Sequence, residues 1–439
     1  MGRRRPPIGV SRLSAVDTPF APATGDRAEH PSEASGRAGT RTPARRIGLF
    51  GHFGTGNIGN EASLEAVLAF VRRERPSAQL LCICSSPEAT LGAYNLASVS
   101  IRRTGSATGW IARVDRLLAK VPSRALDFVR AFRQMRRLDL LIVPGTGILD
   151  DFGDRPGGMP YALFTWLAAA RLAGCKVALI SIGAGPIHNP LSRRLMIAAA
   201  RMAHFRSFRD ELSKRYVASC GVDTHNDPVI PDVAFALPPP EDESVRDGPV
   251  TVGVGVMNYW GWRSGAPEAE AASIHDTYIG KLADFVQRLL AKGYRVRLLL
   301  GHKWDSEAIG RVVARIDAAS YDCREVICEP AENMRDLMRQ IQQTDVVVTT
   351  RYHNVVAALC VARPVISLSY AEKNDALLDD VGLTGLHQHC ETFSVDRLWQ
   401  QLEWTIANRA SLGATIAATV AEYRTRLSEQ EIALIAQWL

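Results

Sequence analysis

The densest group of chemically active side chains lies between residues 345 and 375. A fully apolar run, DVVVTT, leads directly to Arg351, His353 and Asn354, and the next apolar run leads to Lys373. Cationic side chains and a helix N-terminus bind anions, and histidine titrates near neutral pH. A lone histidine after a strand is commonly structural, but its convergence with two cations favours function. The pattern predicts a pocket for a small, multiply charged anion, with Arg351 and His353 catalytic and Lys373 and Asn354 binding substrate.

Glycine-rich turns follow three other predicted strands. The first, GHFGTGNIGNEA, precedes a helix expected to begin near Ala62, and its spacing is neither the dinucleotide fingerprint nor the P-loop. Similar turns occur in VPGTGILDDFGD and SIGAGPI. Glycines allow backbone N–H groups to approach a ligand, although a tight turn without a ligand is the alternative. The residues expected to bind substrate in these turns are Gly54, Asn57, Asn60, Glu61, Gly145, Gly147, Gly183 and Gly185.

The local sequence leaves the role of two further groups of residues undecided. Asp150, Asp151 and Asp154 could hold Mg²⁺ with a diphosphate, but a neighbouring glycine and proline indicate a solvated loop, and no metal is expected. Arg209, in the segment RSFRDELS, either binds a carboxylate or phosphate of the substrate or pairs with an adjacent acid. We retain Arg209 as a candidate substrate-binding residue.

Short apolar runs alternate with helical patterns from Arg46 onward. Helices are expected at residues 161–174 and 305–319, among others, and this alternation predicts parallel sheets with right-handed crossovers. The final helices, around residues 396–439, carry three tryptophans that we expect to pack on one of the sheets. The predicted strands are 46–50, 79–84, 139–145, 176–185, 204–210, 251–257, 295–301, 325–330, 345–350 and 364–370.

The alternating pattern is interrupted once, by the proline-rich and acidic stretch 238–249. We therefore predict an α/β fold with two doubly wound Rossmann-like domains, residues 46–237 on the acceptor side and residues 250–439 on the donor or anion side. In such folds ligands bind in the cleft outside the carboxyl ends of the strands, where the candidate residues lie.

Composition excludes several classes of protein. The 439 residues are 46% hydrophobic, and no stretch has the roughly 18 consecutive apolar residues of a membrane span. Residues 1–46 hold nine Arg and four acids, which accounts for most of the net charge of +6, so no nucleic-acid partner is expected. The tail 1–45 lacks a hydrophobic period and is predicted to be disordered. Eight cysteines without a C-x-x-C pair indicate reduced thiols and a cytoplasmic protein.

One basic segment leaves peripheral membrane contact open. Residues 111–137 contain seven Arg and one Lys against two acids, among regularly spaced apolar residues. Such a segment can lie on anionic lipid at the inner face of the cell membrane. The solvated face of an ordinary core helix is the favoured interpretation.

The order of the motifs resembles the polysaccharide pyruvyl transferase family. The motifs are G-x-F-G-x-G-N-x-G-x-E, the glycine-rich turn VPGTG, S-I-G-A-G-P, R-x-F-R-D, P-D-V-A-F, R-Y-H-N and Y-x-x-K, spread over about residues 46–385. The resemblance implies a GT-B-like fold. It also implies transfer of a pyruvate ketal from phosphoenolpyruvate to a sugar of a cell-surface polysaccharide or its lipid-linked precursor.

This chemistry suits the candidate residues. Phosphoenolpyruvate carries a carboxylate and a phosphate, which Arg209, Arg351 and Lys373 would bind, and His353 would be the general acid. Phosphoenolpyruvate is then a co-substrate, and neither a cofactor nor a metal is required. Because side chains at exposed strand ends contribute little packing, replacing Arg351 or His353 by Ala is expected to abolish activity and leave the fold nearly intact.

The chain departs from the family's pattern at two positions. Asn60 stands where Asp is common, with Glu61 next to it, and Thr146 replaces the middle one of three glycines. Either change could indicate another acceptor or a member that no longer performs the reaction. Two alternatives therefore stay open: a nucleotide-sugar-dependent GT-B glycosyltransferase, with Glu372 or Asp375 at the ribose, and a non-catalytic polysaccharide-assembly protein.

Overall fold

The computed structural model describes residues 45–102, 121–152, 154–241, 248–261, 267–316 and 325–438. Several predicted features lie wholly or partly outside these residues: the N-terminal tail through residue 44, residues 111–120 of the basic segment, the middle of the proline-rich linker, residues 317–319 of the helix predicted at 305–319, and Cys323. The seven other cysteines are free thiols. No helix of the described chain is both long and apolar enough to cross a membrane.

The first sheet has six parallel strands in the order β3-β2-β1-β4-β5-β6. This is the order of the doubly wound Rossmann fold, in which the direction of winding reverses between β1 and β4. The strands are β1 (Arg46–Gly51), β2 (Gln79–Cys84), β3 (Ser98–Ser100), β4 (Leu140–Val143), β5 (Lys176–Ile182) and β6 (Phe205–Phe208).

The second sheet repeats this topology. Its six parallel strands have the order β12-β11-β10-β7-β8-β9, so the winding reverses between β7 and β10. The two predicted Rossmann-like halves are therefore confirmed as a fold. The strands are β7 (Thr251–Gly255), β8 (Arg295–Leu299), β9 (Val326–Cys328), β10 (Val346–Thr349), β11 (Val365–Ser369) and β12 (His387–His389).

Central strands are apolar along their whole length because helices cover both faces of each sheet. All four residues of β4, LLIV, and all four of β10, VVVT, are buried. In the first half the helices are α1 (Ile58–Glu74), α2 (Pro87–Tyr94), α4 (Val121–Met135), α5 (Met159–Leu172), α6 (Pro190–Arg201) and α7 (Glu211–Ser219), with the 3₁₀ turn η1 (Val233–Ala236). In the second half they are α8 (Glu268–Ala291), α9 (Asp305–Val313), α10 (Met334–Gln342), α11 (Tyr352–Cys360), α12 (Glu372–Asp380) and α13 (Val395–Trp438).

The start of α1 differs from the prediction. The helix begins at Ile58 rather than near Ala62. The side chain of Asn57 accepts hydrogen bonds from the backbone N–H groups of Gly59 and Asn60, at 3.0 and 3.4 Å, and so caps the helix before the glycine pattern ends.

Two other predicted features are wrong in detail. The strand at residues 139–145 is the fourth along the chain rather than the third, because β3 (Ser98–Ser100) is too short and polar to show a hydrophobic period. The helix expected over 305–319 ends at Val313. Neither difference moves a candidate site residue away from the end of its strand.

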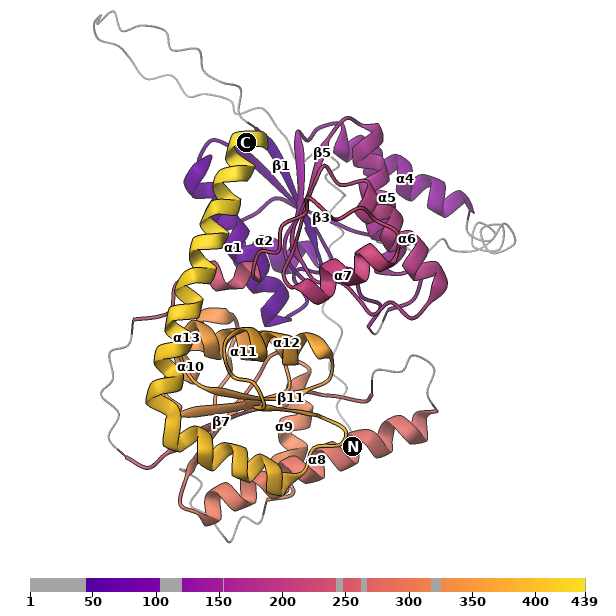
Figure 1. Cartoon of the computed structure of the whole chain (residues 1–439). Coiled ribbons are helices and arrows are strands. Elements are labelled where there is room, and N and C mark those ends of the chain that lie inside the picture. The colour runs from indigo at the N-terminus through magenta and orange to yellow at the C-terminus, as the bar shows by residue number, and fades with distance from the viewer. Residues whose placement is uncertain are drawn as a thin grey trace, which may run out of the picture. The chain divides into compact units, whose positions relative to one another are not determined.

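The helices predicted at the C-terminus form the single helix α13, which runs along both halves (Figure 1). Trp399 stacks on Tyr294 in the second half, with ring centroids 6.3 Å apart. Trp438 instead packs edge-on against His204 in the first half, and Trp404 is exposed. The expectation that these tryptophans pack on one sheet is therefore wrong.

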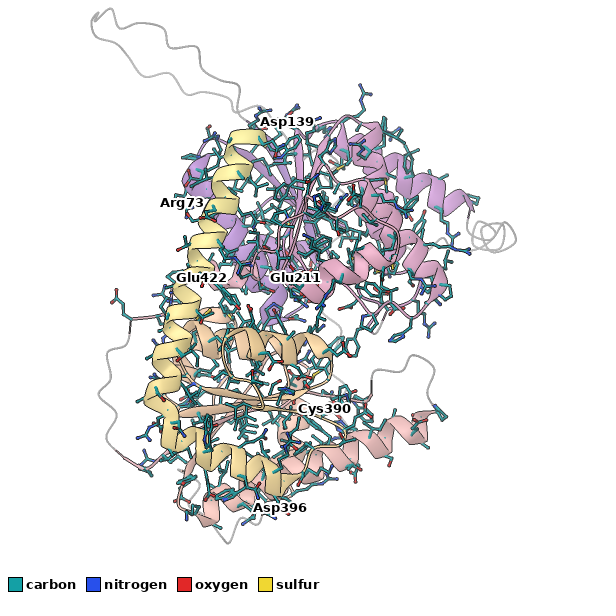
Figure 2. The ribbon with its side chains drawn as sticks, viewed as in Figure 1. Arg73, Asp139, Glu211, Cys390, Asp396 and Glu422 are labelled. Atoms are coloured by element: carbon teal, nitrogen blue, oxygen red, sulfur yellow. The ribbon has the colours of Figure 1, made fainter. Side chains whose placement is uncertain are left out.

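The C-terminal part of α13 is fastened to the first sheet by buried polar groups. Gln430 accepts a hydrogen bond from the hydroxyl of Ser207 and donates one to the hydroxyl of Ser181, at 3.2 Å. At the surface Glu431 pairs with Arg73, which Figure 2 labels on α1, at 2.7 Å. Through these contacts a helix that follows the second sheet in sequence holds the first.

We predict that Gln430→Ala lowers the free energy of unfolding by about 1–3 kcal/mol, because two buried hydroxyls lose their partner. Glu429→Ala, at an exposed neighbouring position, is the control and should change stability by less than about 0.5 kcal/mol. Urea unfolding measures both. Equal stability of the two variants would show that the helix is held by apolar packing alone.

Candidate functional site

A cavity of about 430 Å³ is lined by residues of both halves. The first half contributes Arg209 and Asp232, the second contributes Tyr352 and Lys373, and α13 completes the wall. Glu211, labelled in Figure 2 at the start of α7, also lines it. These residues follow β6, β10 and β11, so the cavity lies at the carboxyl ends of the strands, where doubly wound folds bind ligands.

A buried carboxylate connects the two halves beside this cavity. Asp232 is 1% exposed, and its Oδ2 lies 3.4 Å from Nη1 of Arg209 and 3.6 Å from Nε2 of His353. Its Oδ1 accepts a hydrogen bond from the N–H of Ala234 and so caps the turn η1. A strand end of each half thus delivers a cationic or titratable group to one carboxylate.

Asp232 and Arg209 each stabilise the charged form of the other. Burial alone would raise the pKa of Asp232, but the adjacent His353 and Arg209 outweigh burial and hold it below its ordinary value. Burial also disfavours the charge of Arg209, whereas the neighbouring Tyr352, Asp210 and Asp232 hold the pKa of its guanidinium above the ordinary value. The cluster is therefore a carboxylate with an arginine cation on one side and an imidazole on the other.

Arg209 is held in place on several sides. Its guanidinium carbon lies 4.2 Å from the centre of the Tyr352 ring, and its Nε lies 3.3 Å from Oδ2 of Asp210. A Cβ at Gly183 would lie 2.5 Å from Cζ of Arg209, so only glycine allows this approach. The open choice for Arg209 is resolved in part, because the side chain both pairs with acids and lines the cavity.

Glycine also permits the close approach of His353 to the first half. A Cβ at Gly59, in the first turn of α1, would overlap the imidazole of His353. The Nε2 atom of His353 has no hydrogen-bond partner within 3.5 Å among the described residues, which leaves the nearby carboxylate of Asp232 as its neighbour. The imidazole is therefore confined between α1 and Asp232.

Lys373 reaches the same region from the second half. Its Nζ lies 3.5 Å from Oδ2 of Asp150, which follows β4, and 5.1 Å from the centre of the Tyr370 ring. Gly147 lies against that carboxylate, since a Cβ there would be 2.6 Å from Oδ2 of Asp150. The predicted substrate-binding residues Lys373 and Gly147 are thus brought together.

Asp150, Asp151 and Asp154, the three acids considered above as Mg²⁺ ligands, make separate contacts. Asp151 accepts hydrogen bonds from the N–H groups of His188 and Asn189, at 3.0 and 2.8 Å, and Asp154 accepts one from Met159 at the start of α5. Within the described chain no group of three or more His, Cys, Asp or Glu side chains is arranged to hold a metal ion.

Arg351 is placed differently from the expectation. Its Nε and Nη2 bind the two oxygens of Asp305, at 2.9 and 2.6 Å, and Asp305 is completely buried. Removing Arg351 would leave that carboxylate buried without its cation, which costs several kcal/mol. In contrast to the expectation from the sequence alone, we therefore predict that Arg351→Ala destabilises the fold.

Asn354 is also buried rather than presented to the cavity. Within the described structure neither its Oδ1 nor its Nδ2 has a hydrogen-bond partner. Gly255 and Gly301 make room for it, since a Cβ at Gly301 would lie 2.6 Å from its Oδ1. The side chain lies against Gly255, the last residue of β7, and against Gly301, which follows β8.

Glu61 organises the first glycine turn from below. Its Oε1 accepts hydrogen bonds from the N–H groups of Gly54 and Thr55, at 2.8 and 3.3 Å, and its Oε2 accepts one from Tyr94 at 3.4 Å. The residue is 7% exposed, and this burial raises the pKa of its carboxyl. Next to it, Asn60 donates a hydrogen bond to the carbonyl of His52.

The remaining predicted glycines pack against backbone or rings. The carbonyl of Gly145 accepts a hydrogen bond from Ser63, and a Cβ on this glycine would lie 2.5 Å from the carbonyl oxygen of Ser181. Gly185 has a φ of +71° and lies against the ring of Tyr216. These contacts explain both glycines through close packing.

The first glycine turn meets the second half directly. The N–H of Ile58 donates to the carbonyl of Gly301 at 3.2 Å, and the N–H of Lys303 donates to the carbonyl of Gly56 at 3.3 Å. The turns after β1 and β8 are therefore in backbone contact.

Sequence reasoning missed the acids that position the predicted cations. Asp232 lies in the motif P-D-V-A-F, but the sequence alone assigned no role to its carboxylate. The local signal was a proline followed by an aspartate, a pair that could cap a turn. Asp305 gave no local signal, because an acidic residue is common in the first turn of a helix such as α9. Buried acids are visible only once the strand ends are placed together.

Comparison with family models matches residues 57–372 to the model described as polysaccharide pyruvyl transferase. The chain belongs to the polysaccharide pyruvyl transferase family. The match includes every strand except β1 and β12 and every candidate site residue except Gly54 and Lys373. Membership in the family makes the protein a transferase. A search of curated proteins found no match.

Solved structures show the same fold in other enzymes. MnaA of S. aureus in complex with UDP is 10% identical, with a TM-score of 0.57, and the match covers 89% of this chain and 96% of that one. The UDP-GlcNAc 2-epimerase of Neisseria meningitidis bound to UDP-GlcNAc is 11% identical, with a TM-score of 0.55 and coverage of 89% and 100%. Anabaena HepE in complex with UDP and glucose is 14% identical, with a TM-score of 0.55 and coverage of 90% and 99%. These likenesses confirm the GT-B-like fold of the family member described here.

We predict that Glu61→Gln folds and retains transferase activity, because an amide oxygen still accepts the hydrogen bonds of the glycine turn. The pKa of Glu61 is raised in the folded state, so the ionised carboxylate costs stability at neutral pH, and Gln removes that cost. Glu61→Ala should lose about 1–3 kcal/mol, measured by chemical denaturation. A Gln variant that is as stable as the unmodified protein but inactive would make Glu61 a participant in the reaction.

Proposed function

We propose that this protein transfers a pyruvyl group from phosphoenolpyruvate to two hydroxyls of a saccharide, forming a cyclic ketal in a cell-envelope polysaccharide or its precursor. The observation that carries the proposal is the cluster of Arg209, Asp232 and His353 beside a cavity that Lys373 also lines. It supplies cations for a small dianion and places an imidazole, a group that can transfer a proton, next to a carboxylate.

Phosphoenolpyruvate has two anionic groups close together. Arg209 and Lys373 are proposed to bind its carboxylate and phosphate, because both line the cavity and reach it from opposite halves. Arg351, two residues before His353, is proposed as a further cation at the end of β10, held in place by Asp305. The charge is supplied by side chains, so we propose a reaction without a cofactor.

The proposed reaction begins with a proton transfer. His353 donates a proton from its imidazole ring to C3 of phosphoenolpyruvate, the CH₂ becomes CH₃, and positive charge develops at C2. A saccharide hydroxyl adds to C2 and gives up its proton. The bond between C2 and the phosphate oxygen then breaks, inorganic phosphate leaves, and a second hydroxyl of the same saccharide adds to C2 with loss of its proton. One phosphoenolpyruvate and one diol thus give one ketal and one phosphate.

Asp232 has a positioning role in this scheme. Its carboxylate, 3.6 Å from Nε2, is proposed to orient the imidazole that donates the proton to C3. The same carboxylate holds Arg209, so donor binding and proton transfer share one anchor. The two open alternatives make different demands: a nucleotide-sugar glycosyltransferase needs a base and ribose site, and an assembly protein needs no proton donor.

Donor binding is tested by thermal unfolding with phosphoenolpyruvate, UDP-glucose and GDP-mannose as separate additions. We predict that phosphoenolpyruvate raises the melting temperature and that the nucleotide sugars do not. Lys373→Ala should weaken phosphoenolpyruvate binding about 10- to 100-fold, because a charged hydrogen-bond partner contributes about 1.5–3 kcal/mol. Lys176→Ala, at the start of β5 and so at the edge of the sheet opposite the carboxyl ends of the strands, is the control. Stabilisation by a nucleotide sugar alone would favour the glycosyltransferase.

The role of Asp232 is tested by the turnover of Asp232→Asn. An uncharged amide no longer balances the guanidinium of Arg209 or the charge of the imidazole that donates the proton, so kcat should fall about 10- to 100-fold while the protein stays folded. Asp227→Asn, which alters another aspartate–arginine pair outside the cavity lining, is the control and should leave kcat unchanged. An unchanged kcat in a folded Asp232→Asn would remove Asp232 from the mechanism.

A lipid-linked acceptor and peripheral membrane contact remain part of the proposal. On α4, which belongs to the basic segment, Leu126 and Val129 are 54% and 42% exposed and stand three residues apart on one face. Arg133 continues this exposed face one turn further along. An apolar and cationic face suits anionic lipid, and co-sedimentation with phosphatidylglycerol vesicles at low salt tests it.

A further inference from the structure

Trp304 has the most exposed large apolar side chain among the described residues, at 74%. It follows β8 and immediately precedes α9. An indole left in water carries a large apolar surface that a partner can cover. Its position relative to the candidate site indicates which partner that is.

The two residues that flank Trp304 both belong to the contact between the halves. The stem of Lys303 packs on Gly56, where a Cβ would lie 2.8 Å from Cδ, and its N–H donates to the carbonyl of Gly56. On the other side, Asp305 binds the guanidinium of Arg351. The residues on either side of Trp304 are therefore in contact with the first glycine turn and with the cation that precedes His353.

The local backbone and ring contacts hold Trp304 in place. Asn258, after β7, donates from Nδ2 to the carbonyl of Trp304 at 3.3 Å, and its backbone N–H donates to Asp305 at 2.9 Å. The ring of His302 lies 4.8 Å from the indole, tilted by 38°. An exposed indole with a fixed backbone is preorganised for stacking.

A second tryptophan nearby shows how an occupied ring differs. Trp260 donates from Nε1 to Oδ1 of Asn258, and its ring stacks on His275 at 4.1 Å with an angle of 2°. Arg311 lies 5.5 Å from the centre of the same ring. With these neighbours the side chain of Trp260 is 39% exposed, whereas that of Trp304 is 74% exposed.

We propose that Trp304 is the stacking surface for the acceptor saccharide, an inference that rests on the proposed function. A pyranose ring presents one face of C–H groups that packs on an indole, while its hydroxyls need polar partners at the rim. Lys303 and Glu307, which are both exposed and stand one and three residues from Trp304, can supply such groups. Trp304 would hold the acceptor while Lys373 and Arg209 hold the donor.

The test uses the full-length protein and saturation-transfer NMR with three probes: methyl β-galactoside, methyl α-mannoside and methyl β-glucoside. We expect saturation of the ring C–H protons of at least one probe, at least a fivefold loss of this signal in Trp304→Ala, and its retention in Trp304→Phe. Trp404→Ala, which removes another exposed tryptophan from α13, is the control and should leave the signal unchanged.

This experiment contains no phosphoenolpyruvate, so its result does not depend on donor binding, which the thermal-unfolding experiment measures separately. Saccharide binding through Trp304 without phosphoenolpyruvate binding would overturn the reaction and keep the stacking surface. An unchanged signal in Trp304→Ala, or no signal from any of the three probes, would overturn the stacking surface. Sedimentation that shows a dimer in the unmodified protein and a monomer in Trp304→Ala would assign the indole to self-association instead, which also overturns it.

Discussion

The buried carboxylate of Asp232 is the constraint on which the rest of the site depends. A side chain that is 1% exposed can stay ionised only if cations replace the water it has lost, and Arg209 and His353 are in position to do so. Arg209 follows β6 and His353 lies in the first turn of α11, so the two groups come from different sheets. One buried aspartate is therefore in contact with a cation of its own half and with an imidazole of the other half.

Much of the local sequence can be understood as what this contact requires. Gly59 and Gly183 lack side chains where His353 and Arg209 approach, and Glu61 holds the first glycine turn in the shape that meets Gly301. The helix α13 returns to the first sheet through Gln430 (Figure 1). The same topology in both sheets brings these groups to carboxyl strand ends, where one donor and one acceptor would be held from opposite sides.

The sequence predicts the sheets well and the site only in part. Apolar runs such as DVVVTT mark the central strands because both faces are covered, whereas β3 and the early start of α1 depend on short-range polar contacts without a period. The cations were predicted because Arg and Lys after strands are unusual. Asp305 and the exposed Trp304 acquire meaning only from residues distant in sequence, so no local pattern could reveal them. The motif around Asp232 indicates a turn cap, but its contacts with Arg209 and His353 also depend on residues distant in sequence.

The central claim is that C3 of phosphoenolpyruvate is protonated on this protein. The most direct measurement is to incubate the enzyme in D₂O with phosphoenolpyruvate and saccharides that carry neighbouring free hydroxyls, and to examine the product by mass spectrometry and NMR. The account predicts a pyruvyl ketal whose methyl group contains solvent deuterium, together with one inorganic phosphate per ketal. A ketal without deuterium, or a glycoside formed from a sugar nucleotide with release of the nucleotide, would contradict it.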